Sequence, residues 1–404
     1  MFHPKLSKTL KGKKNGCRGW NFSDEDDRPL ILIHVASEGE YEGAKPLIDQ
    51  LIGTNRMNVA VSFSSPSVKK SVSATDGLFA YGFLPHDFLI EQLRLLDRLE
   101  PELVLIFKHD FWPNLLRAAS LLSITIGLVN ANFHSRSQRG LPIIKLFHKA
   151  FMKNLNFIWT VGEADRDRIK PLVSSGTKLR VGGDTRYDRV IIRAERGTYS
   201  FKQLSDAFTG KHIIVAGSTW EQDEKIIFQA FAAIRATNPS LRLIAAPHEP
   251  VPSALHRIGG LAEKYSMRSL LWSNFDGKKI DEDVLIIDQT RILAGIYSVG
   301  WAAYVGGGFG VGVHSVIEPA ACSLPVIFGP NHHVSHEAGL LISIKGGFEV
   351  HNSAQVKEIW SAWLDNYDAY ESASKAALQV VTSNAGAVNR LMEKVESCLK
   401  LNTN

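Results

Sequence analysis

The segment AAYVGGGFGVGVHSVIEPAACSLPVIFGP, residues 302–330, decides how this chain is expected to fold. The short apolar run that ends at Val305 predicts a strand, and a glycine-dense turn follows it. A helix carrying Glu318 is expected to begin at His314, and the apolar run Pro325–Phe328 predicts a second buried strand. The segment therefore predicts a strand, loop, helix and strand, which is a repeating unit of α/β folds.

The glycines of this turn suit a bound phosphate. Glycine has no Cβ atom, so the main chain can approach a ligand closely and can adopt positive φ. The following helix start would offer unpaired N–H groups and the positive end of its dipole. The dinucleotide fingerprint GxGxxG does not fit, because no glycine from Gly306 to Gly312 has glycines at both plus two and plus five. We therefore expect a nucleotide other than a dinucleotide.

Composition limits the class of protein. The chain has 404 residues, 45% of them apolar and 22% charged, which predicts a globular protein of two domains. Its net charge of +5 favours anionic partners without singling out nucleic acid. The three cysteines lie far apart and lack CxxC spacing, which argues against disulfides and zinc and indicates a reducing compartment. No uncharged apolar run is long enough to span a bilayer, so we expect a soluble or peripheral protein.

Residues 1–28 read as a charged arm. Six basic residues and no acidic ones precede Trp20, and the acidic run Asp24–Asp27 follows. Such an arm could lie on an anionic membrane surface, and it could equally be a solvated terminus. These residues leave both interpretations open.

From Leu30 onward, short apolar runs alternate with amphipathic segments of helical period. This alternation predicts parallel sheets covered by helices on both faces. It loosens at the polar segment Glu195–Gly210 and restarts at residue 212, so we place one α/β domain at 29–200 and a second at 201–375. Residues 376–404 are expected to form a terminal helix that could pack back on the N-terminal domain. Ligands of such folds bind at the loops that follow strands.

Polar residues follow the strands of the first half. Glu40, in the crowded acidic segment after the first strand, is a candidate general base, because neighbouring carboxylates raise one another's pKa. Taken alone, the residues favour a simpler role, in which Glu40 complements a helix dipole. Lys108 and Asp110 would project into the mouth of a cleft, and a surface ion pair explains them nearly as well. Arg186 could bind a carboxylate or phosphate with both arms of its fork, or form a salt bridge in a domain linker.

The second half offers further candidates. Ser218 and Thr219 could donate hydrogen bonds to a phosphate or simply cap a helix. His248 follows the next strand, where a lone histidine is usually structural. No acidic pair follows a strand and no HExxH motif occurs, so a metal is not predicted.

Taken in order, these segments resemble the 3-deoxy-D-manno-octulosonic acid (Kdo) transferases of lipopolysaccharide assembly. The resemblance runs from about Leu30 to about Phe348. The segments that carry it are His34–Glu40, Phe111–Pro113, Gly217–Thr219, Pro247–His248, Gly306–Phe309, His314–Ala320 and Pro325–Pro330.

The resemblance implies a glycosyltransferase of GT-B architecture, with two Rossmann-like domains facing a cleft. It implies transfer of Kdo from CMP-Kdo to a lipid A precursor, lipid IVA, with inversion of the anomeric centre and without metal or cofactor. The protein would act peripherally at the cytoplasmic face of the inner membrane and would have no nucleic-acid partner. Many members begin with an apolar anchor that this chain lacks, and the basic arm could replace it.

The resemblance also assigns roles to residues. Glu40 matches the general base, which reverses the preference stated above. The donor is expected to contact Arg186, Ser218, Thr219, His248, Gly307, Gly308, Phe309, His314, Ser315 and Glu318. The acceptor side comprises Ser37, Gly39, Lys108 and Asp110. The chain departs from the common family pattern at Ser67, Lys108, Pro247 and Ser315.

Two other functions stay open. One is a different GT-B enzyme, either another nucleotide-sugar transferase or a sugar-nucleotide epimerase. The other is a catalytically silent nucleotide-binding protein that recruits partners to the membrane. The sequence leaves open the number of Kdo units, the phosphorylation of the acceptor and the oligomeric state.

Overall fold

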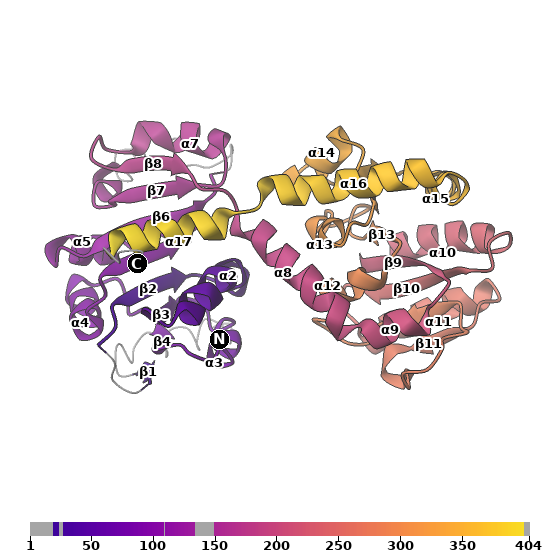
Figure 1. Ribbon diagram of the computed structural model, residues 1–404, viewed down its shortest axis with the longest axis horizontal. Helices are drawn as coiled ribbons and strands as arrows, with labels where there is room; N and C mark the ends of the chain where they lie inside the picture. Colours follow the sequence, from indigo (N-terminus) through magenta and orange to yellow (C-terminus); the bar gives the residue numbers. More distant parts are fainter. Residues whose placement is uncertain (1–18, 24–26, 109, 134–148, 400–404) are drawn as a thin grey trace, which may run out of the picture. The chain divides into compact units, whose positions relative to one another are not determined.

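The computed structural model describes residues 19–23, 27–108, 110–133 and 149–399 (Figure 1). The chain divides into two compact units, Met1–Arg189 with Ala385–Asn404, and Val190–Asn384. These boundaries differ from the expected ones at 200/201 and 375/376. The polar segment near residue 195, read as a linker, is the end of a long helix, α8 (Thr185–Ser200), that begins in one unit and ends in the other.

The described part of the first unit forms an eight-stranded sheet of order β1-β4-β3-β2-β5-β6-β7-β8. Only β1 runs antiparallel to its neighbour; the remaining pairings are parallel. The strands are β1 (Asn21–Phe22), β2 (Leu30–Val35), β3 (Asn58–Phe63), β4 (Ala80–Phe83), β5 (Leu103–Phe107), β6 (Thr125–Ala131), β7 (Phe157–Thr160) and β8 (Lys178–Val181).

Helices cover both faces of this sheet. Successive side chains of a strand point to opposite faces, and because most of these strands are apolar along their length, both faces have to be buried. In β2, Ile31 and Ile33 pack in the core beneath α2, whereas Leu32 packs in the core on the opposite face. The helices are α2 (Glu38–Thr54), α3 (Lys69–Ser73), α4 (Leu89–Leu99), α5 (Pro113–Leu121), α7 (Glu163–Ile169) and α17 (Ala387–Cys398), with the 3₁₀ turn η3 (Lys170–Leu172).

The last helix, α17, returns to the first unit. Its apolar residues Val388, Leu391 and Val395 join the core beside α2. The Asp188 carboxylate accepts hydrogen bonds from the backbone N–H groups of Gly386 (2.8 Å) and Ala387 (3.1 Å), which fixes the start of α17. The preceding helix, α16 (Tyr367–Asn384), belongs to the second unit.

The predicted arm at residues 1–28 is too long. Trp20 is buried, and its indole Nε1 donates a hydrogen bond to the Phe83 carbonyl at 3.0 Å. Its ring fills the space over Gly82, where any Cβ atom would collide with it. Strand β1 pairs with β4 directly afterwards. The chain from Trp20 onward therefore belongs to the first unit, and residues 1–18 lie outside the described part.

The second unit contains a seven-stranded sheet in its described residues, with order β11-β12-β10-β9-β13-β14-β15. Each pairing is parallel. The strands are β9 (His212–Thr219), β10 (Leu241–Pro247), β11 (Ser269–Leu271), β12 (Val284–Ile286), β13 (Ala302–Val305), β14 (Val326–Phe328) and β15 (Gly347–Glu349). The helices are α9 (Lys202–Ala207), α10 (Glu221–Arg235), α11 (Pro252–Lys264), α12 (Leu293–Ile296), α13 (Ile317–Ala321), α14 (His336–Ser343), α15 (Ser353–Asp365) and α16, with the 3₁₀ turns η4 (Trp272–Asn274) and η5 (Tyr297–Val299).

Both strands expected in the opening segment are present, as β13 and β14. The helix expected at His314 begins instead at Ile317 and is only five residues long. The turn extends further than expected because the His314 N–H donates back to the Gly306 carbonyl at 3.2 Å. His314 and Ser315 are therefore parts of the turn rather than of a helix start.

Each sheet has a point where the order of strands reverses, between β2 and β5 in the first unit and between β9 and β13 in the second. In open α/β sheets, ligands bind at the carboxyl ends of the strands beside such a point. The loops after these four strands hold most of the expected site residues. The topology thus supports both loop clusters as candidates.

Candidate functional site

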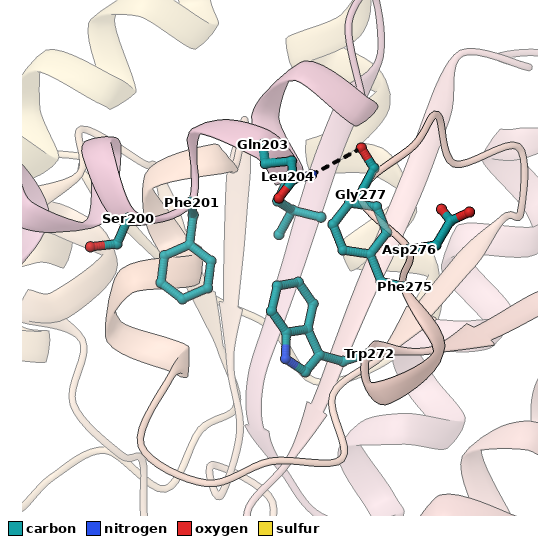
Figure 2. A pocket seen from close by; sticks show the side chains of 8 residues that line it. All are labelled: Ser200, Phe201, Gln203, Leu204, Trp272, Phe275, Asp276 and Gly277. Atoms are coloured by element: carbon teal, nitrogen blue, oxygen red, sulfur yellow. Dashed lines mark hydrogen bonds between the residues drawn. The ribbon is translucent and has the colours of Figure 1, made fainter.

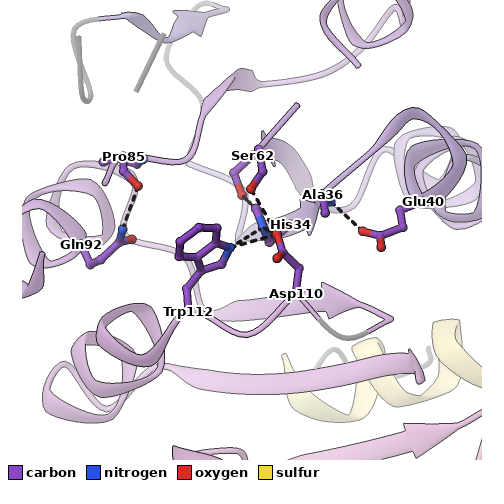
Figure 3. Close-up of polar contacts among 9 residues, drawn as sticks. His34, Ala36, Glu40, Ser62, Pro85, Gln92, Asp110 and Trp112 are labelled. Atoms are coloured by element: carbon purple, nitrogen blue, oxygen red, sulfur yellow. Dashed lines mark hydrogen bonds and ion pairs between the residues drawn. The ribbon is translucent and has the colours of Figure 1, made fainter. Parts of the chain in front are cut away.

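Glu40 lies in the first turn of α2, directly after β2. It is only 7% exposed, and its Oε2 accepts a hydrogen bond from the Ala36 N–H at 2.6 Å (Figure 3). Ser37 caps the helix, and its hydroxyl accepts from the Glu40 N–H at 3.4 Å. Burial raises the pKa of Glu40, although the Ala36 hydrogen bond and the charge of Lys108 oppose this. A carboxylate with a raised pKa is suited to accepting a proton near neutral pH.

Gly39 and Lys108 are two residues in the surroundings of Glu40, and the charge of Lys108 acts on its carboxyl group. Among the described residues, no atom lies within 4 Å of the position that a Cβ atom would take on Gly39. Lys108 has a left-handed backbone with φ of 60°, and its N–H donates to the Val129 carbonyl at 2.9 Å. Apart from its chain neighbours and its own helix backbone, the described residues therefore leave open the Cβ side of Gly39, the residue before the candidate base.

Asp110 is held by a network that the sequence did not predict. Its Oδ2 lies 3.0 Å from His34 Nε2 and accepts from Trp112 Nε1 at 2.9 Å and from the Ser64 hydroxyl at 3.1 Å (Figure 3). The other imidazole nitrogen, Nδ1, lies 2.9 Å from the Ser62 hydroxyl. His34 is fully buried. The ordinary alternative, a surface pair with Lys108, gives way to this network.

The pKa values of the Glu40 and Asp110 carboxyl groups are shifted in opposite directions. Burial alone would raise the pKa of Asp110, but the hydrogen bond and charge of His34, with the Trp112 and Ser64 hydrogen bonds, hold it below its usual value. Glu40 is shifted upward instead. Two carboxyl groups whose environments separate their pKa values can take different roles, one exchanging protons and one staying charged.

Arg186 belongs to the first unit, whereas the other donor candidates belong to the second. It stands in the first turn of α8, and its guanidinium pairs with Asp184 through Nε at 2.8 Å and Nη2 at 2.7 Å. Most of the remaining donor candidates belong to the end of β9 and to the loops after β10 and β13 in the second unit, and Glu318 lies on α13 in that unit. The role of Arg186 toward the donor stays a prediction.

In the second unit, the glycines of the turn are required by the protein's own backbone. A Cβ atom on Gly306 would collide with the Ser218 carbonyl, one on Gly307 with the Gly312 carbonyl, and one on Gly308 with the Gly329 main chain. From the sequence, we expected these glycines to let the main chain approach a ligand. In the described part of the structure, Gly310 is the glycine of this group with no atom within 4 Å of its Cβ position.

Three aromatic rings stack beside this turn. The rings of Trp220 and His248 lie 5.0 Å apart at 20°, and those of His248 and His314 lie 4.4 Å apart at 15°. Trp220 Nε1 lies 3.1 Å from His314 Nε2 and donates to it. Burial and then the charge of His248 lower the pKa of His314, so the neutral imidazole that accepts this bond is favoured. The stack presents His248 as an exposed ring.

The remaining donor candidates differ in how far their side chains are exposed and in which groups they already contact. The buried Thr219 hydroxyl lies 3.3 Å from Glu224 Oε1, so its expected hydrogen bond is made inside the unit. Phe309 packs against the unit's core. Ser218 is half-buried with φ of 54°, and Ser315 is exposed. Glu318 Oε1, on α13, lies 3.8 Å from Arg193 Nη1.

A separate pocket of about 410 Å³ lies in the second unit between α9 and the segment after β11 (Figure 2). Its walls include the rings of Phe201, Trp272 and Phe275, with Asp276 at one side. None of the expected site residues lines it.

The part of the chain that the structure describes contains no group of three histidine, cysteine, aspartate or glutamate side chains placed to hold a metal ion. Within the same residues, no helix combines the length and the apolar character needed to cross a bilayer.

Residues 12–189 match the family model described as 3-deoxy-D-manno-octulosonic-acid transferase (kdotransferase). The chain is similar to the Kdo transferase family. The 3-deoxy-D-manno-octulosonic acid transferase of Haemophilus influenzae is 26% identical over 384 residues, which are 92% of this chain and 88% of that protein. The Aquifex aeolicus transferase is also 26% identical, over 81% of this chain and 83% of its own. The resemblance to this family, expected from the motifs, is thus confirmed.

The fold of this chain is shared by enzymes of known structure. UDP-GlcNAc 2-epimerase from Neisseria meningitidis matches with a TM-score of 0.64 and 13% identity, over 91% of this chain and all of its own. A glycosyltransferase from Rickettsia africae matches with a TM-score of 0.57 and 12% identity, over 93% of this chain and all of its own. The expected GT-B architecture of two Rossmann-like domains is therefore confirmed.

Sequence reasoning missed His34, Trp220 and Asp223 as site residues. His34 interrupts the otherwise apolar strand LILIHV, which was a signal available in the sequence. Trp220 directly follows the Gly-Ser-Thr segment. Asp223 stands at the third position of α10, where an acidic residue commonly caps a helix, but its partners Tyr304 and Gly307 lie far away in the sequence.

Proposed function

We propose that this protein transfers Kdo from CMP-Kdo to a lipid A precursor, lipid IVA, with inversion of the anomeric centre and without metal or cofactor. Similarity to the Kdo transferase family supports the donor sugar. The observation that carries the proposed chemistry is Glu40, a buried carboxyl with a raised pKa after a strand at the reversal of the sheet.

In the proposed reaction, Glu40 removes the proton from the attacking hydroxyl of the acceptor sugar. The hydroxyl oxygen forms the new bond to the anomeric carbon of Kdo, while the bond from that carbon to the CMP phosphate oxygen breaks. The bonding electrons leave with CMP, and the proton stays on Glu40. Burial favours the protonated form of Glu40, which makes it a stronger base than an exposed carboxylate.

Asp110 is proposed to orient the acceptor. Its lowered pKa keeps it charged, and the hydrogen bonds from Trp112 and the contact with His34 fix its direction. A fixed carboxylate can accept a hydrogen bond from a sugar hydroxyl without having to reorganise during the reaction. Ser37, Gly39 and Lys108 are proposed to border the same acceptor.

On the donor side, backbone N–H groups of the glycine turn and the exposed ring of His248 are proposed to receive the CMP phosphate. Preformed donors of this kind stabilise charge on a leaving group when no metal does so. Glu318 is proposed to accept hydrogen bonds from the ribose diol. Arg186 is proposed to bind the Kdo carboxylate, since a guanidinium can bind both oxygens.

The protein is proposed to act peripherally at the cytoplasmic face of the inner membrane, where a lipid acceptor is embedded. Residues 1–18 carry six basic residues and no acidic ones. Attraction of such residues to anionic lipid contributes about 1 kcal/mol each near the surface.

The test is an assay of the purified full-length chain with CMP-Kdo and lipid IVA, with products identified by mass. We expect a product heavier by one or more Kdo units and release of CMP. Parallel reactions with UDP-GlcNAc test the epimerase and other transferase alternatives. Conversion of UDP-GlcNAc without Kdo transfer would replace our proposal with one of these, and binding of CMP without any product would favour the silent nucleotide-binding protein.

A further inference from the structure

One buried carboxylate fastens the glycine turn after β13 to the start of α10. Asp223 Oδ2 accepts hydrogen bonds from the Gly307 N–H and the Trp220 N–H, each at 2.9 Å. Asp223 Oδ1 accepts from the Tyr304 hydroxyl at 3.0 Å. The residue is 1% exposed. A single side chain thus joins the end of β13, the turn and the first residue before α10.

The peptide groups around Gly307 are central to the turn. Gly307 has φ of 91°, and its carbonyl accepts from the N–H groups of Gly310 at 3.0 Å and Gly312 at 2.9 Å. The next carbonyl, of Gly308, accepts from the Asn331 N–H at 2.8 Å. The Gly307 N–H shares its peptide group with the Gly306 carbonyl, which accepts from the His314 N–H at 3.2 Å, so Asp223 fixes the direction of the peptide that closes the turn at His314.

The Asp223 carboxylate also holds the backbone of Trp220, the first residue of the ring stack. Its bond to the Trp220 N–H caps α10, since Asp223 is the third residue of that helix. The Trp220 ring then leads the stack with His248 and His314. Asp223 therefore sets the two structures proposed to receive the donor, the turn and the stack, relative to each other within one unit.

The charge of Asp223 lacks the compensation that neighbouring acidic groups have. Glu224 is paired with Arg257 at 2.6 Å and 3.0 Å, and Asp283 is paired with Arg235. No lysine or arginine forms a salt bridge with Asp223 in the part of the chain that the structure describes. Burial raises the pKa of Asp223, against its hydrogen bonds from Gly307, Trp220 and Tyr304. Burying a carboxyl without a cation opposes folding, so stability alone does not account for it.

We propose that Asp223 is a positioning residue for the donor half of the reaction, holding the glycine turn in the conformation that receives the donor phosphate. The identity of that donor rests on the function proposed above. The hydrogen bonds themselves, rather than the negative charge, perform this role. Asparagine at this position can keep both N–H bonds on its oxygen, while the Tyr304 hydroxyl rotates to accept from its amide.

The test compares Asp223→Ala with Asp223→Asn in the full chain, using Asp283→Ala as the matched control. Asp283 is a buried carboxylate of the same unit that accepts from the Arg268 N–H at 2.9 Å, outside the turn. Hydrogen exchange of residues 306–313 in the free protein is measured first. We expect about tenfold faster exchange in Asp223→Ala, from the loss of one or two hydrogen bonds, and near wild-type exchange in Asp223→Asn and Asp283→Ala.

Steady-state kinetics give the second readout. Asp223→Ala is expected to raise the KM for CMP-Kdo about tenfold and to leave the KM for the lipid acceptor unchanged, whereas Asp283→Ala lowers thermal stability without changing either KM. If Asp223→Ala does not fold, Tyr304→Phe removes one of the three donors, and a smaller rise in turn exchange of about twofold is expected.

Unchanged exchange of the turn in the folded Asp223→Ala variant, or in Tyr304→Phe if Asp223→Ala does not fold, would overturn the proposal. Impairment of Asp223→Asn equal to that of Asp223→Ala would also overturn it, because charge would then matter and not geometry. If the wild-type protein makes no Kdo product but the turn responds as expected, the positioning role stands and the proposed donor is wrong.

Discussion

His34 Nε2 lies 3.0 Å from Asp110 Oδ2, although 76 positions separate these residues along the chain. His34 lies in β2 and Asp110 in the loop after β5, and the two strands are neighbours in the sheet. The contact therefore joins strand β2 to the loop after β5, on the two sides of the strand reversal. The first unit presents a fixed carboxylate at Asp110, and Glu40 is the separate group that we propose exchanges a proton.

Replacing Glu40 with glutamine tests the base. Glutamine keeps an oxygen for the Ala36 N–H but cannot take a proton from the acceptor, so we expect kcat to fall by about 10²- to 10⁴-fold. The dissociation constant of CMP, measured by calorimetry, should not change. Glu38→Gln is the matched control in the same helical turn and should keep wild-type turnover. Turnover retained by Glu40→Gln would remove Glu40 from the role of base.

The pH dependence of turnover follows from the direction of the same shift. Burial raises the pKa of Glu40 above 4.5, and the base acts only when deprotonated. We expect kcat/KM to fall as the pH is lowered through this raised value, with an acidic limb above that of an ordinary glutamate. Rate profiles over the acidic range check this. A limb at the ordinary value would contradict the assignment.

The contribution of Glu40 to the unfolding free energy should change with pH in the direction opposite to its effect on turnover. At low pH the carboxyl is protonated in both folded and unfolded states, so it has no effect. As the pH rises, the unfolded state loses its proton first, and the folded state, with the raised pKa, becomes less stable relative to it. Glu40→Gln should therefore have a larger unfolding free energy than wild type near neutral pH, and this advantage should shrink toward about pH 4. Thermal unfolding at several pH values measures it.

Replacing His34 with alanine tests the network around Asp110. The change leaves the buried Ser62 hydroxyl without its imidazole partner, so we expect the unfolding free energy to fall by about 1–3 kcal/mol. The KM for the lipid acceptor should rise while CMP affinity stays the same.

Gln92→Ala is the control for His34→Ala. Gln92 is also fully buried in the first unit, and its amide donates to the Pro85 carbonyl (Figure 3). It also donates to the His86 carbonyl. Its loss should lower stability without raising the acceptor KM. Equal rises in acceptor KM in both variants would show that general destabilisation, and not the Asp110 network, is responsible.

Glu318→Ala tests the ribose assignment. The ion pair with Arg193 is long, at 3.8 Å, so its loss should change stability little. The dissociation constant of CMP should rise about tenfold, from the loss of one or two hydrogen bonds. Asp276→Ala removes a carboxylate from the separate pocket of the same unit and should leave CMP binding unchanged. The reverse pattern would place the nucleotide in that pocket.

Much of the sheet architecture could be predicted because the strands are local apolar runs. β2, LILIHV, and β5, LVLIF, are buried along their whole length, and the alternation with helices follows from this. β4 is harder to predict, because AYGF is not a continuous apolar run and is stabilised by Trp20, a distant residue whose ring covers Gly82. β15 is a three-residue edge strand that exists through its pairing with β14.

The candidate site was predicted less completely than the fold. Glu40 and Asp110 follow apolar strands, so the sequence marks them. Their partners do not follow from spacing: His34 meets Asp110 through strand pairing, and Asp223 reaches Gly307 across 84 positions. The turn glycines were interpreted as ligand contacts, whereas Gly306, Gly307 and Gly308 are packed against the protein's own main chain. Such roles depend on which backbones meet in the folded unit.

The return of α17 to the first unit has a consequence for how this protein is made. The apolar side of α2 is completed by Val388, Leu391 and Val395, which emerge from the ribosome after the whole second unit. The first unit is therefore synthesised with part of its core uncovered while the second can already fold, which reverses the usual N-terminal-first order of folding. Truncation before Ala387 should thus destabilise the first unit and expose apolar side chains of α2, which favours aggregation.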